Sequence, residues 1–234
     1  MGRQVQAGAS GRGGLVARAL ERARPARPQG TGARQGRWLL LALAVLLAAC
    51  SRAAPLAGTD LGALPAPDFA LPDQDGATVE LEALRGRPVV LTFLYTHCPD
   101  VCPLTAEKLR RVAADLGPQA DDVAFVAVST DPDHDDAAAA ADFVEQHGLT
   151  GRLRFLLGDR AALSPVWSAY YVYAAPPPPD ADPAERAAAN YAARTAVHTD
   201  ALFVIDRQGR ERTLLHSDFD PPALASTLRT LLRE

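Results

Sequence analysis

Two cysteines, Cys98 and Cys102, stand four residues apart at the end of a strongly apolar segment. One tight turn brings side chains at this spacing to the same side, close enough to share a metal ion or to form a disulfide. A bridge across so few residues closes a small loop and adds little stability, so a purely structural disulfide is the weaker interpretation. Two thiolates are soft ligands of the kind that select Cu(I). The pair is therefore a candidate metal or redox site.

A third ligand would complete a metal site, and the chain offers five histidines. His198 precedes an apolar segment and follows a long Pro- and Ala-rich stretch, a position from which it can fold over the cysteines. His97 adjoins Cys98, but neighbouring side chains point in different directions. The remaining histidines occupy a polar turn, a helix end and a strand end, where solvated histidines are common: His134, His147 and His216. Spacing favours His198 and leaves the choice open.

The residues around the cysteines predict how they are held. Residues 89–95 (VVLTFLY) are continuously apolar and β-branched, which is typical of a central strand covered on both faces. Open α/β sheets place ligands in the loops at the carboxyl ends of such strands. Pro103 then opens a helix expected over residues 104–116, in which Leu109, Val112 and Leu116 follow a helical spacing. A helix start next to a cysteine favours the thiolate over the thiol.

The rest of residues 67–234 alternates between strand and helix patterns. Two hairpins are predicted around Asp75-Gly76 and Gln208-Gly209, and further strands and helices are expected at residues 123–129, 135–146, 153–157, 161–171 and 221–233. This order predicts an α/β protein with a mixed central sheet, flanked by helices and preceded by an N-terminal β-hairpin. A thioredoxin-like fold fits the order best. Residues 174–196 interrupt it with a proline-rich segment of unusual length.

Charge is distributed unevenly along the chain. Residues 1–49 contain eight arginines and one acidic residue, Glu21, whereas the remainder has a formal charge of −11. An acidic body does not attract a phosphate backbone, so we expect no nucleic-acid partner. Hydrophobic residues make up 48% and charged residues 22% of the chain, values that exclude a wholly disordered chain and a multispan membrane protein.

The N-terminal region has the pattern of an export signal. Residues 38–49 (WLLLALAVLLAA) form an apolar run behind two arginines, too short for a membrane-spanning helix, which needs roughly 20 residues. The run ends in Leu47-Ala48-Ala49-Cys50, which resembles the lipobox of bacterial lipoproteins, where the cysteine becomes the lipidated first residue. A signal anchor, or an ordinary signal cleaved after Ala49, is the alternative.

This pattern sets the expected domain organisation and location. We expect an export signal with a disordered beginning over residues 1–49, a tether over residues 50–66 and one domain over residues 67–234. Lipidation at Cys50 would hold that domain outside the cytoplasm, in the periplasm or on the outer face of the cell membrane.

Three segments resemble the Sco/SenC family: residues 67–103, which end in Thr-His-Cys-Pro-Asp-Val-Cys-Pro, residues 129–132 (STDP) and residues 197–206, which begin with VHTD. The resemblance implies a thioredoxin-like copper-binding protein on the outer face of a membrane, where it takes part in assembling the binuclear copper centre of cytochrome c oxidase subunit II. It also implies that Cys98, Cys102 and His198 are the copper ligands. His134 departs from the family motif, which usually has an arginine there.

The resemblance favours a copper metallochaperone, which has no catalytic turnover of its own. The alternative is a thiol–disulfide oxidoreductase that uses Cys98 and Cys102 as a redox pair to reduce the cysteines of the oxidase copper site. Thioredoxin-type enzymes, however, have two residues between their cysteines and do not need His198. A thiol peroxidase is less well supported, because nothing marks Cys98 over Cys102 as the peroxidatic residue. The two leading roles can coexist, since copper loading requires a reduced pair.

Overall fold

The computed structural model describes residues 55–172 and 200–234. The predicted export signal, Cys50, His198 and the proline-rich segment over residues 174–196 lie outside the described residues. Within the described ranges, no helix has both the length and the apolar character needed to cross a bilayer.

Strands and helices alternate along the described chain. The strands are β1 (Thr59–Pro65), β2 (Ala70–Pro72), β3 (Thr78–Glu80), β4 (Val89–Leu94), β5 (Ala124–Ser129), β6 (Leu153–Leu156), β7 (Leu202–Ile205) and β8 (Arg210–Leu215). The α-helices are α2 (Val101–Leu116), α3 (Ala137–Gln146), α4 (Arg160–Ala169) and α6 (Pro221–Arg233), with 3-10 turns at η1 (Glu82–Leu84) and η2 (Gly117–Asp122).

The main sheet has six strands in the order β1-β8-β7-β4-β5-β6. Strands β4, β5 and β6 are parallel, whereas β7 and β8 add antiparallel partners on the other side of β4. The predicted mixed sheet is therefore confirmed, with β4 near its middle. The predicted N-terminal hairpin is also confirmed, because β2 pairs with β3 in a separate antiparallel sheet, and Gly76 turns the chain with a φ of +78°.

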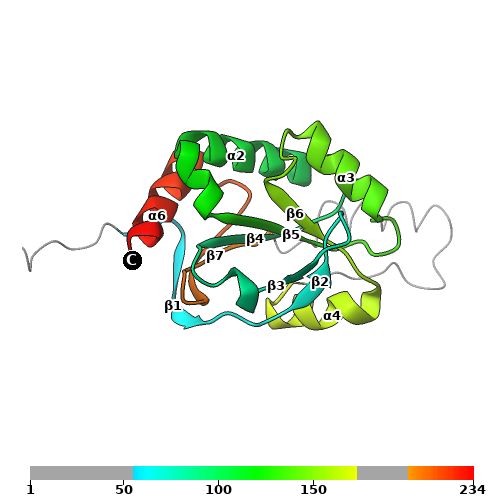
Figure 1. Ribbon diagram of the computed structural model, residues 1–234, viewed down its shortest axis with the longest axis horizontal. Helices are drawn as coiled ribbons and strands as arrows, with labels where there is room; N and C mark the ends of the chain where they lie inside the picture. Colours follow the sequence, from blue (N-terminus) through cyan, green and yellow to red (C-terminus); the bar gives the residue numbers. More distant parts are fainter. Residues whose placement is uncertain (1–54, 173–199) are drawn as a thin grey trace, which may run out of the picture. The chain divides into compact units, whose positions relative to one another are not determined.

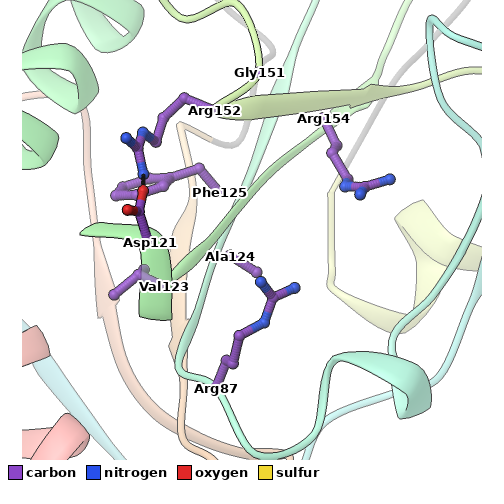
Figure 2. A pocket seen from close by; sticks show the side chains of 8 residues that line it. All are labelled: Arg87, Asp121, Val123, Ala124, Phe125, Gly151, Arg152 and Arg154. Atoms are coloured by element: carbon purple, nitrogen blue, oxygen red, sulfur yellow. Dashed lines mark hydrogen bonds and ion pairs between the residues drawn. The ribbon is translucent and has the colours of Figure 1, made fainter. Parts of the chain in front are cut away.

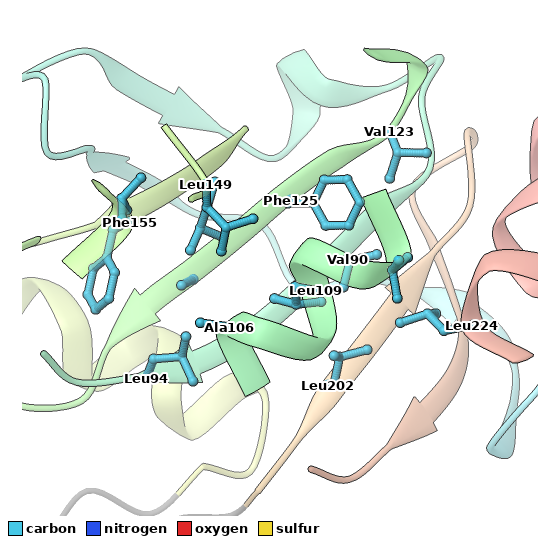
Figure 3. Packing of buried hydrophobic residues seen from close by; sticks show 14 of the residues in the cluster. Val90, Leu94, Ala106, Leu109, Val123, Phe125, Leu149, Phe155, Leu202 and Leu224 are labelled. Carbon is cyan, nitrogen blue, oxygen red and sulfur yellow. The ribbon is translucent and has the colours of Figure 1, made fainter. Parts of the chain in front are cut away.

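Helices cover both faces of this sheet (Figure 1). Helices α2, α3 and α6 lie on one face, and α4 lies on the other together with the β2–β3 hairpin. Side chains of β4 alternate between the two cores: Val90 and Leu94 pack toward α2, while Leu91 and Phe93 pack toward α4. Figure 3 shows the first of these cores, where Leu109 of α2 lies over the sheet near Phe125 of β5. The arrangement is the thioredoxin-like α/β fold predicted from the sequence.

The structure differs from the expected tether at residues 59–65. These residues form β1, an edge strand that pairs antiparallel with β8. Just before it, the backbone of Ala57 is held by the hydroxyls of Thr227 and Thr213, at 2.8 and 2.6 Å. Only glycine fits at Gly58, where φ is +95° and a Cβ would lie 2.5 Å from a carbonyl oxygen of β8. Backbone pairing at a sheet edge leaves most side chains exposed, so it produces no apolar pattern in the sequence.

Candidate metal centre

The cysteines lie where the central strand meets the first long helix. Strand β4 ends at Leu94, the loop that follows carries Cys98, and Cys102 lies in the first turn of α2. The helix begins at Val101, three residues before the start expected from the sequence. Pro103 is tolerated there because the first-turn N–H groups of a helix have no intrahelical acceptor. Both sulfurs therefore sit at the carboxyl edge of the parallel strands, as predicted.

The two cysteines contact each other directly. The backbone N–H of Cys102 donates to Sγ of Cys98 at 3.3 Å, and both thiols are free. Their side chains are nearly buried, with 5% of Cys98 and 4% of Cys102 exposed. A first-turn N–H group directed at a sulfur favours its thiolate, both as a hydrogen-bond donor and as the positive end of the helix dipole.

The environment divides the pair into one thiolate and one thiol. The hydrogen bond from the thiol of Cys102 is the largest influence on Cys98 and, against the opposing effect of burial, lowers its pKa to about 5. The same bond and burial raise the pKa of Cys102 above its ordinary value. These opposite shifts favour a thiolate at Cys98 and a thiol at Cys102 at neutral pH.

A buried carboxylate supports the loop that carries Cys98, and no sequence pattern indicates this role. Asp135 accepts hydrogen bonds from the N–H and the hydroxyl of Thr96, at 2.9 and 2.7 Å, and from the hydroxyl of Ser129 at 2.6 Å. It thereby joins the loop after β4 to the end of β5. Burial raises the pKa of Asp135, and its charge contributes to the raised pKa of Cys102. The sequence had placed this residue in the first turn of a helix, although α3 begins two residues later.

Removing this carboxylate should destabilise the protein. Asp135→Ala leaves three buried or half-buried donors without an acceptor, and we expect the free energy of unfolding to fall by about 3 kcal/mol. The matched control is Asp136→Ala, which removes an exposed N-cap that accepts from the N–H of Ala139 and should cost about 1 kcal/mol. Urea unfolding of both variants measures the difference. Equal losses would show that Asp135 acts only as a local cap.

The structure places the other candidate histidines as follows. His97 and His134 lie beside each other, with ring centroids 6.2 Å apart. His147 packs against Phe143 at the end of α3, and Nδ1 of His216 lies 2.7 Å from the carbonyl oxygen of Asp200. Asp131 forms the turn after β5 and its carboxylate holds His134. No group of three or more His, Cys, Asp or Glu side chains within residues 55–172 and 200–234 is arranged to hold a metal.

The described residues thus bring two sulfur atoms together at one point. A nearly buried thiolate and a thiol that can lose its proton to a metal form a donor set that fits Cu(I). His198 itself lies outside the described residues, so its place as the third ligand remains a prediction.

A cavity of about 140 Å³ lies at the opposite ends of the parallel strands and takes no part in this site. Figure 2 shows Arg87 and Arg152 lining it beside Val123 and Ala124, at the start of β5. Asp121 pairs with Arg152 at 2.7 Å, and Arg154 pairs with Asp73 at 3.0 Å.

Fold and site together define a thioredoxin-like protein with a buried dithiol at the start of its first long helix. Residues 58–233 match the family model SCO1/SenC, and the chain belongs to this family. The structure of ScoI from Bradyrhizobium japonicum with copper bound is 30% identical, with a TM-score of 0.59, and the match covers 73% of this chain and 100% of that one.

Two further relatives are more distant or only partly matched. The mitochondrial protein SCO2 homolog of Mus musculus is 36% identical over 117 residues, which are 49% of this chain and 45% of the relative. The chain thus matches less than half the length of this curated relative. BsSco, described as a member of the Sco family of cytochrome c oxidase assembly proteins with a disulfide switch, is 18% identical. Its TM-score is 0.58, over 74% of this chain and 95% of that one, and shows the shared fold.

Proposed function

We propose that this chain is a copper metallochaperone, which binds Cu(I) and delivers it to the binuclear copper centre of cytochrome c oxidase subunit II. Cys98, Cys102 and His198 are the proposed ligands. The observation that carries the proposal is the paired sulfurs at the start of α2, with Sγ of Cys98 3.3 Å from the N–H of Cys102. Membership of the SCO1/SenC family and the copper-bound structure of ScoI support copper as the ion.

The chemistry of the pair suits a protein that must release its ion. Two thiolates hold Cu(I) firmly, and here they come from the loop after β4 and from the first turn of α2. The third proposed ligand, His198, completes the coordination while the chain carries copper. Ligands of the acceptor can then replace it, which allows direct exchange of copper.

Transfer between purified proteins tests the function itself. The chain loaded with one Cu(I) is mixed with the metal-free copper domain of subunit II, and the copper in each protein is measured after chromatographic separation. We expect most of the copper to move to the oxidase domain. A control mixture with free Cu(I)–chelator complex at the same concentration should load it more slowly. Copper that stays on this chain at equilibrium would contradict the proposal.

The asymmetry of the two cysteines favours a second candidate function. A thiolate at Cys98 beside a protonated Cys102 is the arrangement of an attacking and a resolving thiol, as in a thiol–disulfide oxidoreductase. In this role the chain would reduce the cysteines of the oxidase copper site before copper arrives. A variant of the transfer experiment distinguishes the roles. The copper domain of subunit II is supplied in its disulfide form, without copper, and the thiols that appear on that domain are counted.

We also propose that the chain is exported and anchored to the outer face of a membrane through a lipid on Cys50. The apolar run before Cys50 and its lipobox-like end support this. Cys50→Ala should therefore stop lipidation and move the protein from the membrane fraction to the soluble fraction, as measured by fractionation and by the mass of the mature N-terminus. Unchanged processing and membrane association in the variant would contradict lipid anchoring.

A further inference from the structure

Two exposed histidines lie against each other next to the cysteine pair. His97 precedes Cys98 in the loop after β4, and His134 lies in the turn after β5. Their ring centroids are 6.2 Å apart, with an angle of 69° between the planes. The dithiol site described above does not use either imidazole. Their partners show which nitrogen of each ring is available.

The Nδ1 atom of His134 is held by a carboxylate. It lies 3.0 and 2.9 Å from the two carboxylate oxygens of Asp131. An ionised carboxylate only accepts hydrogen bonds, so Nδ1 of His134 carries the proton. In the neutral ring the lone pair is then on Nε2, and no described residue bonds to that atom.

The same conclusion holds for His97 through a chain of two hydrogen bonds. The hydroxyl of Thr96 donates its only proton to Asp135 at 2.7 Å. The same hydroxyl lies 2.9 Å from Nδ1 of His97 and can only accept a hydrogen bond from it. Nδ1 of His97 therefore carries a proton too. The lone pair of His97 is again on Nε2. Metal-binding histidines typically have this arrangement, in which a hydrogen bond at one nitrogen orients the ring and sets the tautomer.

We propose that His97 and His134 form a second metal site, which binds Cu²⁺ through the Nε2 atoms of both rings. A metal–nitrogen bond is about 2.0 Å long, so two rings that share an ion through Nε2 have centroids roughly 4.5 Å apart when they are cis and about 6.3 Å apart when they are trans. The observed 6.2 Å lies in this range. Both rings are exposed, so they can adjust to the ion without disturbing the core.

The ligand chemistry separates this site from the dithiol. Neutral imidazoles suit divalent ions, among which Cu²⁺ binds most strongly, whereas thiolates prefer Cu(I). No third His, Cys, Asp or Glu side chain within residues 55–172 and 200–234 joins the two histidines in a metal-binding group, so we expect water to complete the coordination. Such a site holds its ion more weakly than the three-ligand site and exchanges it readily. Its position next to Cys98 places the weakly held ion near the cysteine pair.

The test uses the full chain with both thiols removed, Cys98→Ser/Cys102→Ser, so that its outcome does not depend on the proposed Cu(I) site. Cu²⁺ is titrated at neutral pH, and electron paramagnetic resonance counts the nitrogens bound to it. We expect one Cu²⁺ per chain with two imidazole nitrogens. In this background, His97→Ala and His134→Arg should each weaken binding at least about tenfold.

Two matched variants complete the experiment. His216→Ala removes another exposed imidazole and should leave Cu²⁺ binding unchanged. Nδ1 of His216 also has a hydrogen-bond partner, but in the described structure this ring is not paired with a second histidine. His198→Ala should also leave it unchanged. Equal unfolding midpoints for all variants establish that the losses are local. The proposal is overturned if the parent chain binds no Cu²⁺, if binding survives His134→Arg, or if His198→Ala abolishes it.

Discussion

Replacing Cys98 by serine should remove the ability of the chain to keep Cu(I) against a competing chelator, with a loss of affinity of about 100-fold or more. A serine hydroxyl is a hard, protonated group and cannot replace the thiolate that the N–H of Cys102 stabilises. Chelator competition on the native and variant chains measures the loss. Cys50→Ser makes the same substitution at a cysteine that is not a proposed ligand and should keep the native affinity.

Oxidation provides an independent version of the same experiment. A disulfide between Cys98 and Cys102 removes both thiolates at once, so the oxidised chain should bind no Cu(I) until it is reduced. A thiol count first establishes that the sample is fully oxidised. If this sample still bound one Cu(I) per chain, ligation by the cysteines would be disproved.

The unequal acidities of the pair also predict how many protons copper displaces. With the pKa of Cys98 at about 5 and that of Cys102 raised, only Cys102 carries a proton at neutral pH. Binding should therefore release one proton per Cu(I) at pH 7 and approach two below pH 5, so affinity falls more steeply as the pH drops. Calorimetry in two buffers of different ionisation enthalpy counts the protons. Two protons at pH 7 would refute the asymmetry.

His198→Ala should separate the two candidate functions. Loss of one ligand out of three should weaken Cu(I) retention about 10- to 100-fold and speed its release, by analogy with the effects of altered metal sites. Dithiol exchange has no obvious need of this imidazole, and the thiols keep their position at the start of α2. Reduction of a model disulfide should therefore change little. His216→Ala, at the end of β8, is the matched histidine control for both assays.

Copper retention and disulfide reduction are both measured on His198→Ala, so one variant decides between the two functions. In a cell that depends on this protein, the variant should also assemble less active oxidase. If His198→Ala abolished disulfide reduction and left copper retention unchanged, the metallochaperone proposal would be wrong and the oxidoreductase would replace it.

Local sequence determined most of the sheet and the position of the dithiol. The side chains of β4 are apolar on both faces of the strand, so both faces must be buried. The turn pairs Asp75-Gly76 and Gln208-Gly209 determine two hairpins. The spacing of Cys98 and Cys102 brought two sulfurs together because a single turn covers that distance. These features depend on neighbours within a few residues, which is why they are visible without the fold.

Tertiary structure alone decided what depends on residues distant in the chain. Strand β1 exists because its backbone pairs with β8, about 150 residues later, and such pairing places no requirement on side chains. Asp135 accepts hydrogen bonds from Thr96, which precedes it by 39 residues, and His97 meets His134 only because β4 and β5 are parallel neighbours. The division of the cysteines into thiolate and thiol likewise follows from the hydrogen bond that the thiol of Cys102 donates to Cys98, with burial further raising the pKa of Cys102. Sequence therefore identified the reactive residues, and folding determined their protonation and their neighbours, because pKa values and ligand pairs depend on distances that only the packed chain defines.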